Sequence, residues 1–567
     1  MDSSIRPVIY QLFPRLFANL NDSRVPGGRI EVNGSGKLND LNSDVLREIR
    51  SLGVTHVWYT GIIEHAHDVD YTRFGIKRHN PAVVKGRAGS PYAIVDYYDV
   101  DPDLAQDVNA RMSEFEALVE RTHLAGMKVV IDFVPNHVGR QYSSDSAPSG
   151  IVDFGTNDRT DYFFWPANNF FYIPRQQFAP VDVDMGKGDE AYVEFPAKAT
   201  GNDCFTAFPS RNDWYETVKL NYGVDPWNGS KHFSPTPDTW LKMLHVLRFW
   251  AAKGVDGFRC DMAHMVPVEF WQWAIRAVKK DYPDTLFIAE LYDTGIYRDY
   301  LFRAGFDYLY DKVNLYDTLR GIQCDDISAA RLTSCWQTTE GISDRMLNFL
   351  ENHDEQRFAS EFYAGNADMV VPSLVAIATI STGAVMIYNG QELGEKGMDE
   401  EGYSGRDGRT SIFDFWSMDT VSRWLGTDYK PSNKRLTTRE HSLRELYAKV
   451  LNWVNSKEVF RCGAFFDLMY VNYESAGINP HRHYVYMRST ADESALVFLN
   501  FCNEAASAEV KIPEHAFKVL GLPYGQVECV NLLNGVKSKV RLKPDSTVHV
   551  EVPPNNAAVL CFKHSNV

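Results

Sequence analysis

The sequence of 567 residues lacks any hydrophobic run long enough to cross a membrane, which takes about 20 consecutive apolar residues. Its first residues, Met1-Asp-Ser-Ser-Ile-Arg-Pro7, also lack the apolar stretch of a signal peptide. We therefore expect no membrane partner and a cytoplasmic location. A secreted or periplasmic protein whose signal peptide has been removed would show the same pattern, so that alternative stays open.

A surplus of basic residues is lacking as well. The chain has 58 Lys and Arg against 74 Asp and Glu, which gives a formal net charge of −16. Binding to a phosphate backbone requires a basic patch or stripe. The composition therefore argues against nucleic acid as a partner. With 44% hydrophobic and 23% charged residues, it is typical of a globular protein.

Closely spaced cysteine pairs are also missing. The eight cysteines are scattered along the chain: Cys204, Cys260, Cys324, Cys335, Cys462, Cys502, Cys529 and Cys561. None of them forms the Cys-x-x-Cys spacing of a zinc site. Cys260 lies inside a predicted strand next to candidate site residues, where a disulfide would distort the site. Free thiols agree with a reducing compartment.

What the sequence does contain is a short apolar strand, Gly257-Phe-Arg-Cys260, that ends in Asp261. Arg259 and Asp261 are two residues apart, so on an extended strand their side chains leave on the same face. A predicted helix, Trp240 to Gly254, precedes this strand, with apolar residues at helical spacing. Helix, loop and strand with a charged tip are typical of a β/α barrel, whose active site lies at the C-terminal ends of the strands. A local Arg259–Asp261 ion pair is the structural alternative.

Three other predicted strands end in the same way. Lys128–Phe133 contains Asp132 and runs into Asn136-His137, Leu286–Ala289 runs into Glu290, and Met346–Leu350 runs into Glu351-Asn-His353-Asp354. Each strand end taken singly is more easily explained as a buried structural acid, a helix cap or a solvated turn. Four such ends in one chain favour a site.

The order of predicted elements indicates an α/β fold, a (β/α)8 TIM barrel. Its strands are predicted at Val8–Gln11, Thr55–Trp58, Lys128–Phe133, Gly257–Cys260, Leu286–Ala289, Phe306–Tyr310, Met346–Leu350 and Ala384–Tyr388. Residues 139–225 are rich in Ser, Asn, Pro and aromatics and predict an inserted domain after the third strand. The barrel then comprises residues 1–138 and 226–460. Short alternating runs after Cys462 predict a C-terminal antiparallel β-sandwich domain over residues 461–567.

In these motifs the chain resembles the α-amylase family of retaining glycoside hydrolases. The four family motifs correspond to Asp132-Phe-Val-Pro-Asn-His137, Gly257-Phe-Arg-Cys-Asp261, Ile288-Ala-Glu290 and Glu351-Asn-His-Asp354, and a fainter fifth to Val218-Lys-Leu-Asn221. The resemblance covers nearly the whole chain, and the order and spacing of the motifs are specific. The family also carries an inserted domain after the third barrel strand.

The resemblance implies a role for each candidate site residue. Asp261 corresponds to the nucleophile, Glu290 to the general acid and base, and Asp354 to the third acid, which binds sugar hydroxyls. Tyr92 corresponds to the ring beneath the sugar that is cleaved, and His137 and His353 to hydrogen-bonding partners of that sugar. Arg259 is expected to pair with Asp261 and to lower its pKa. Glu290 must stay protonated near neutral pH, so its surroundings should be drier or more negative.

The resemblance implies hydrolysis of α-1,4-glucosidic bonds in starch, glycogen or maltooligosaccharides, with retention through a covalent glycosyl-enzyme. A transglycosylase or isomerase of the same family, like trehalose synthase or a glucanotransferase, is the alternative, because the segment Gly405–Thr410 is similar to an Arg-Thr loop of such enzymes. A catalytically inactive carbohydrate-binding homologue is disfavoured, since all three acids are present. Exo or endo action and oligomeric state stay open.

No cofactor is required for this chemistry. A structural calcium ion stays open, because Asn136 corresponds to a calcium ligand in the family. Two residues depart from the family pattern: Met265 replaces a His whose backbone helps to bind that ion, and Lys219 stands where many members have Asp. Calcium sites need about 6 to 8 oxygen ligands, and only Asn136 can be assigned from the sequence.

Overall fold

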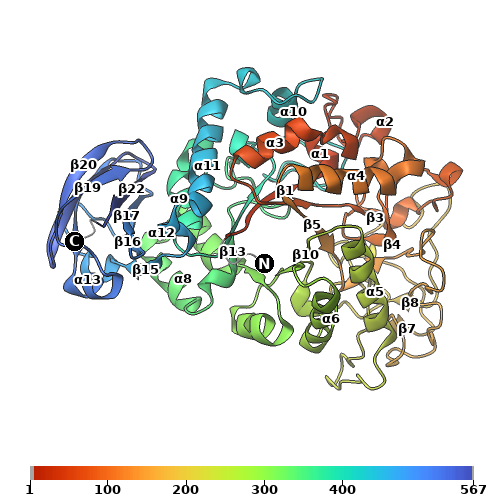
Figure 1. The fold of residues 1–567 in the computed structure, drawn as a ribbon. Coiled ribbons are helices and arrows are strands. Elements are labelled where there is room, and N and C mark those ends of the chain that lie inside the picture. The colour runs from red at the N-terminus through yellow and green to blue at the C-terminus, as the bar shows by residue number, and fades with distance from the viewer. Residues whose placement is uncertain (1–4, 565–567) are drawn as a thin grey trace.

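Eight parallel strands form a closed barrel at the centre of the computed structural model, which describes residues 5–564 (Figure 1). The strands are β1 (Val8–Leu12), β2 (His56–Tyr59), β5 (Lys128–Phe133), β10 (Gly257–Cys260), β11 (Leu286–Ala289), β12 (Tyr308–Tyr310), β13 (Met346–Asn348) and β14 (Ala384–Tyr388). They neighbour one another in sequence order, with β14 closing onto β1. Each strand predicted from the sequence coincides with one of these, so the predicted barrel is confirmed.

Helices alternate with the strands along the chain. The main ones are α3 (Ser43–Ser51), α4 (Arg111–Leu124), α5 (Asp238–Ala252), α6 (Val268–Asp281), α7 (Asp317–Cys324), α8 (Leu332–Thr338), α9 (Val371–Thr379), α10 (Asp419–Leu425) and α11 (Thr438–Ser456). In α6 the buried residues recur every three or four positions, from Phe270 and Trp271 to Ala274 and Val278. This spacing buries one face of the helix.

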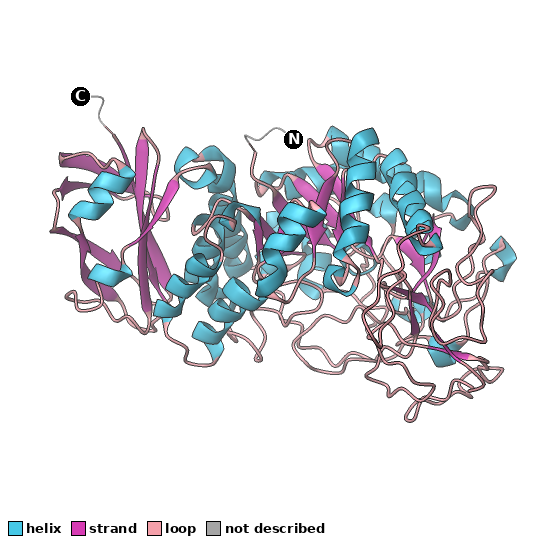
Figure 2. Ribbon diagram, turned by 90° about the horizontal axis from the view of Figure 1, so that it is seen from below, coloured by secondary structure: helices cyan, strands magenta, loops and turns pink. Residues whose placement is uncertain are grey.

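Two excursions interrupt the barrel on the side of the strands' C-terminal ends. The first follows β2 and contains the antiparallel pair β3 (Ile63–His65) and β4 (Ile94–Val100). The second follows β5, where β6 (His137–Gly139) pairs with β9 (Thr217–Lys219) and β7 (Tyr172–Ile173) with β8 (Ala197–Lys198). Most of this second excursion is loop (Figure 2). The predicted boundary at residue 139 falls within β6, and the exact domain limits remain predictions.

The C-terminal region forms a β domain, blue in Figure 1, which packs against the barrel. Its six-stranded antiparallel sheet has the order β15 (Ala464–Asp467), β16 (His483–Ser489), β17 (Glu493–Asn500), β22 (Asn556–Lys563), β19 (Gly525–Asn531) and β20 (Lys537–Leu542). A second sheet pairs β18 (Ala506–Ile512) with β21 (Ser546–Val552). Buried residues of both sheets share one hydrophobic core with the barrel. The predicted antiparallel domain is confirmed.

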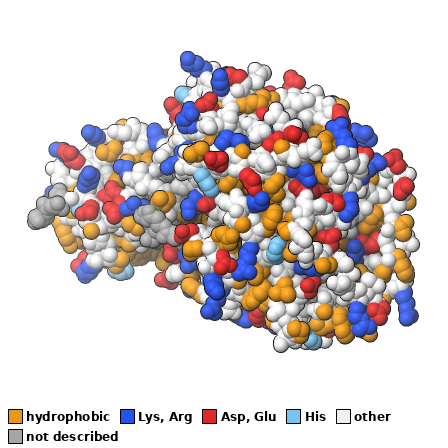
Figure 3. All heavy atoms as spheres, turned by 45° about the vertical axis from the view of Figure 1, so that its right-hand side comes forward, with side chains coloured by type: hydrophobic (Ala, Val, Ile, Leu, Met, Phe, Trp, Pro, Cys, Tyr) orange, Lys and Arg blue, Asp and Glu red, His pale blue; other side chains and the backbone are white. Residues whose placement is uncertain are grey.

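The distribution of surface charges and the state of the cysteines agree with what the sequence led us to expect. Acidic and basic side chains are interspersed over the face shown in Figure 3. All eight cysteines are unpaired. Within residues 5–564, none of the helices combines the length and the apolar character that a membrane span requires.

Candidate active site

Arg259 lies at the centre of the predicted site because β10 runs between β5 and β11 in the barrel. The register places Arg259 beside Asp132 of β5 and Ile288 of β11. Asp261 and Glu290 follow directly after β10 and β11, so both carboxyl groups emerge at the C-terminal end of the barrel. Neighbouring parallel strands thus bring together residues that are far apart in the sequence.

The Arg259 guanidinium contacts both candidate catalytic acids. Its Nη1 donates a hydrogen bond of 2.8 Å to Oδ1 of Asp261, and its Nη2 lies 2.8 Å from Oε1 of Glu290. Nη1 also lies 3.5 Å from Oδ1 of Asp132, and Nε donates to the Tyr310 hydroxyl at 3.2 Å. The guanidinium is fully buried, so these pairs interact in a medium that screens charge poorly.

The second carboxylate oxygen of Asp261, Oδ2, is buried and has no hydrogen-bond partner among the described residues. One oxygen of this acid is therefore held by Arg259, while the other accepts no hydrogen bond from the described residues.

The direction of the Asp261 pKa corrects the sequence expectation. Burial and the negative charge of Glu290 raise the pKa of Asp261 well above its usual value, and Arg259 opposes this rise without reversing it. Arg259 does pair with Asp261 and does act to lower its pKa, as expected. The expected net lowering is wrong, because Asp261 is buried and shares this one guanidinium with Glu290 and Asp132.

Two donors besides Arg259 hold Glu290, which is only 2% exposed. The Tyr292 hydroxyl donates to Oε1 at 2.6 Å, and the backbone N–H of Met262 donates to Oε2 at 2.8 Å. These contacts fix the orientation of the carboxyl group next to Asp261. Tyr292 did not figure among the predicted site residues, although its position two residues after Glu290 is a signal that the sequence contained.

Tyr92 and His353 form one cluster beside the acids, with Tyr92 near Asp132 and His353 near Asp354. Their rings are stacked with centroids 5.2 Å apart, and the Tyr92 hydroxyl lies 2.5 Å from Nε2 of His353. Nδ1 of His353 lies 2.7 Å from Nε2 of Gln11, at the end of β1. Trp58, at the end of β2, donates from its indole to Asp132 at 3.1 Å. Trp58 and Gln11 are supporting residues that no motif indicated.

Asp354 differs from the other two acids because its side chain is 44% exposed. Its Oδ2 lies 3.0 Å from Nε2 of His353. Desolvation acts to raise the pKa of Asp354, but the neighbouring His353, Arg259 and Arg409 outweigh it and lower the pKa to about 2. The carboxylate is therefore charged at neutral pH and available to accept hydrogen bonds from a ligand.

His137 is buried, and its ring centroid lies 5.4 Å from that of Trp214 in the second excursion. Burial, together with the positive charges of Lys219 and Lys85, lowers the pKa of His137 to about 3. The imidazole is therefore neutral at neutral pH and can both donate and accept a hydrogen bond.

These groups lie around a pocket of about 270 Å³ that opens at the surface. Five of the predicted site residues line it: Tyr92, His137, Asp261, Glu290 and Asp354. Arg259 and His353 lie behind them and are almost fully buried. The pocket wall also includes Lys85, Trp214, Glu216 and Phe413, which no sequence signal indicated.

The residues around Asn136 do not fit a calcium ion, because a lysine occupies their centre. The Lys219 ammonium donates to Oδ1 of Asn136, lies 2.7 Å from Oδ1 of Asp203, and approaches the backbone oxygen of Met265 at 3.4 Å. The ammonium already takes up the oxygen that a metal ion would need. Lys219, which stands where many family members have Asp, is therefore the residue that takes up this oxygen of Asn136.

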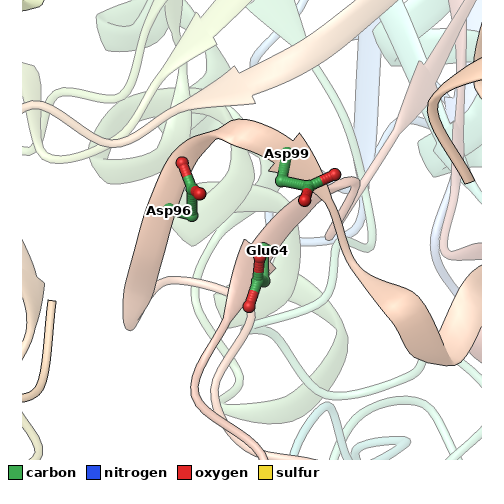
Figure 4. A group of neighbouring side chains, drawn as sticks. All are labelled: Glu64, Asp96 and Asp99. Atoms are coloured by element: carbon green, nitrogen blue, oxygen red, sulfur yellow. The ribbon is translucent and has the colours of Figure 1, made fainter. Parts of the chain in front are cut away.

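A second acidic group lies in the hairpin of β3 and β4, where oxygens of Glu64, Asp96 and Asp99 lie within 4.8 Å of one another (Figure 4). Asp99 forms an ion pair with Arg111, and Asp96 accepts hydrogen bonds from the loop at Ser144, including one of 2.6 Å from its hydroxyl. Burial and the two aspartates raise the pKa of Glu64 well above its usual value. Asp96 and Asp99 therefore have donors of their own, whereas Oε2 of Glu64 has no hydrogen-bond partner among the described residues.

Known proteins that are similar to this chain support the interpretation of this pocket as the active site of a glycosidase. Residues 11–428 match the family described as "Alpha amylase, catalytic domain". The chain is 24% identical over 526 residues to neopullulanase 2 of Thermoactinomyces vulgaris, covering 90% of this chain and 72% of the relative. It is 22% identical over 408 residues to the intracellular maltogenic amylase of Bacillus subtilis, covering 69% of this chain and 56% of the relative.

Among solved structures, the fold is similar to that of a noncanonic maltogenic α-amylase from Thermotoga neapolitana. The TM-score is 0.63 at 20% sequence identity, and the match covers 99% of both chains. The barrel, the acids at its strand ends and a family match over most of the chain lead to one conclusion: the protein belongs to the α-amylase family of glycoside hydrolases.

Proposed function

We propose that this glycosidase cleaves α-1,4-glucosidic bonds of maltooligosaccharides, starch or glycogen with retention, through a covalent glycosyl-enzyme. The observation that carries the proposal is that Asp261 and Glu290 line one pocket and that the Arg259 guanidinium behind them contacts each at 2.8 Å. Retaining glycosidases need two carboxyl groups close together, one as nucleophile and one as proton donor. The relatives' names, neopullulanase and maltogenic amylase, support an α-glucan substrate.

In the first step, Oδ2 of Asp261 attacks the anomeric carbon, since Arg259 holds the other oxygen. The bond between the anomeric carbon and the glycosidic oxygen breaks, and Glu290 gives its proton to that oxygen. In the second step, Glu290 takes a proton from water, the hydroxyl oxygen bonds to the anomeric carbon, and Asp261 leaves as a carboxylate. The proposed reaction requires Asp261 as a carboxylate and Glu290 with its proton.

The remaining residues position the sugar. Asp354 presents a charged carboxylate to the pocket, where it accepts hydrogen bonds from sugar hydroxyls. The neutral His137 imidazole adds a donor and an acceptor, and the Tyr92 ring offers a flat apolar surface. Arg259 and His353 act from behind this layer, so they are positioning residues for Asp261, Tyr92 and Asp354.

Products from maltoheptaose test this proposal. We expect shorter maltooligosaccharides whose new reducing ends first appear as the α-anomer, because double displacement retains configuration. Proton NMR during the first minutes separates this anomer from the β-anomer that mutarotation forms later. A β-anomer as first product would contradict the nucleophile role of Asp261. Products longer than the substrate on a thin-layer chromatogram would favour the transglycosylase.

We propose that the protein is located in the cytoplasm. Eight unpaired cysteines suit a reducing compartment, and one relative is named an intracellular enzyme.

We further propose that Lys219 replaces a calcium ion in this protein. We expect the thermal unfolding midpoint Tm of the wild type to be the same in EDTA and in excess Ca²⁺. The Lys219→Asp variant should be less stable by about 1–3 kcal/mol, since Asn136 loses its buried donor. Added Ca²⁺ should restore part of this loss, because an oxygen set then replaces the ammonium.

Scanning calorimetry of both proteins measures the effect. Lys231→Asp is the matched control, since Lys231 is exposed and pairs with Glu269 at the surface. A wild-type Tm that falls in EDTA and recovers with Ca²⁺ would contradict the proposal.

A further inference from the structure

The two carboxyl oxygens of Glu290 have different surroundings. Oε1 lies 2.8 Å from Nη2 of Arg259 and accepts the hydrogen bond of 2.6 Å from the Tyr292 hydroxyl. Among the described residues, the donor to Oε2 is the backbone N–H of Met262, at 2.8 Å. The proposed reaction needs a proton on this acid, and the difference between its oxygens indicates which of them carries it.

A proton is disfavoured on Oε1. A carboxyl oxygen has two lone pairs. At Oε1 a hydroxyl donates to one of them, and the positive guanidinium of Arg259 lies at contact distance. A proton there would lie against a fully buried cation, where charge is screened poorly. At Oε2 the Met262 N–H takes one lone pair, and the other remains for a proton.

Asp261 shows the same division between its oxygens. Arg259 contacts Oδ1 at 2.8 Å, and Oδ2 accepts no hydrogen bond from the described residues. One guanidinium thus contacts one oxygen of each acid. This leaves Oδ2 of Asp261 for the bond to the anomeric carbon and Oε2 of Glu290 for the proton.

The chain after β10 and β11 supports this arrangement. Met262 has φ +42°, in the left-handed region that is uncommon for a residue with a side chain. This turn leads into the short 3-10 helix Ala263–Met265, where the Ala263 N–H donates to the backbone oxygen of Glu290 at 3.1 Å. After β11, Leu291 is buried in the core, and its neighbours Glu290 and Tyr292 both line the pocket.

Tyr292 is suited to hold Oε1 because its hydroxyl keeps its own proton. Burial and the charge of Glu290 raise the pKa of Tyr292 well above its usual value. The hydroxyl is therefore a neutral donor throughout the pH range of an enzyme assay. In the opposite arrangement the proton would sit on Oε1 and the Tyr292 hydroxyl would accept it, which places that proton beside Arg259.

Several charged or titratable groups face Glu290 and Tyr292 from neighbouring elements: Arg259 of β10, Asp261 and His264 after it, Tyr310 of β12 and Asp354 after β13. The ring centroid of His264 lies 6.1 Å from that of Tyr292. Burial lowers the pKa of His264, and the charge of Glu290 opposes this; Lys219 and Asp293 also face the imidazole. A pH experiment on Glu290 therefore needs a control at His264.

We propose that Oε2 of Glu290 carries the proton that goes to the glycosidic oxygen, and that Tyr292 is a positioning residue that keeps Oε1 occupied. When Oε2 gives up this proton, Glu290 becomes a carboxylate, and the Tyr292 hydroxyl and Arg259 stabilise its charge. In the second step Oε2 takes a proton from water. The proposal rests on the proposed function, because it assumes that Glu290 is the acid.

Tyr292→Phe tests the proposal, since it removes the hydroxyl and keeps the ring. We expect kcat/KM for maltoheptaose to fall on the order of tenfold, because the proton can then also occupy Oε1 and the carboxylate loses a donor. For α-glucosyl fluoride, kcat/KM should change less than about twofold, since fluoride departs without a proton.

The pH profile gives a readout that a merely structural role would not change. A hydrogen bond to a carboxylate favours its charged form, so its loss lets the acid keep its proton to higher pH. The basic limb of kcat/KM for maltoheptaose should move up by about one pH unit in Tyr292→Phe. The position of this limb does not depend on the fraction of folded enzyme.

Tyr297→Phe is the matched control. It removes a hydroxyl from the same loop, but this hydroxyl donates to the backbone oxygen of Tyr310 at 3.2 Å and not to a carboxylate. The basic limb should stay where the wild type has it. His264→Gln should also leave the limb in place, because the lowered pKa of His264 makes its imidazole neutral there.

Equal losses for Tyr292→Phe on both substrates, or a basic limb that stays in place, would overturn the role of Tyr292. A limb that moves in His264→Gln as far as in Tyr292→Phe would assign it to the histidine and also overturn the proposal. Failure of the proposed function looks different, because the wild type would then turn over neither maltoheptaose nor the fluoride.

Discussion

The Asp261→Asn variant is expected to lose about 10⁴-fold or more in kcat while it keeps its fold. The amide has nearly the shape of the carboxylate but cannot form the glycosyl ester. The fold should survive because Arg259 keeps two other acidic partners, Glu290 and Asp132. The buried guanidinium is thus not left unpaired, which is the situation that destabilises strongly.

Turnover of maltoheptaose and the Tm of the same preparation check this expectation. A well-folded variant that retained a tenth of wild-type activity would remove Asp261 from the nucleophile role. In that case Asp132, which also contacts Arg259, would be the next candidate.

The Glu290→Gln variant is expected to lose about 10²–10⁴-fold on natural glucans and little on α-glucosyl fluoride. A glucosidic oxygen needs a proton to depart, whereas fluoride departs unaided, so only the natural substrate requires the acid in the first step. The amide oxygen can still accept the hydrogen bond from the Met262 N–H, so the side chain should keep its place.

Azide separates the two roles of Glu290. Without the base that activates water, the glycosyl-enzyme should accumulate on the fluoride, and azide, which needs no base, should attack it and yield α-glucosyl azide. Asp261→Asn should show no such rescue, since it forms no glycosyl-enzyme. Equal losses for Glu290→Gln on both substrates would remove Glu290 from the acid role.

The eight barrel strands were predictable because each is a short apolar run bounded by turn residues. The candidate acids were predictable for a related reason. Asp261 and Glu290 follow directly after strands, and in a β/α barrel all such positions meet at one end. The hairpin of β3 and β4 was missed, since the only signal in that segment was assigned to a loop around Tyr92.

The electrostatics of the site could not be read from the sequence. The pairing of Arg259 with Asp261 follows from their spacing on one strand, but its second partner, Glu290, comes from the neighbouring strand. The sum of these contacts, with burial, reverses the expected direction of the Asp261 pKa. The sequence shows that Lys219 departs from the family pattern. Its contact with Asn136, however, exists only because β9 pairs with β6.

By itself, the sequence determined the barrel, the order of the domains and the identity of the acids at the strand ends. These features follow from local periodicity and from where apolar runs stop. Only the tertiary structure decided which charges share a partner and what encloses the pocket. Lys85 and Glu216 belong to two different excursions and form one wall because both loops pack over the same end of the barrel. Loop packing depends on contacts between distant segments, which leave no periodic signal in the chain.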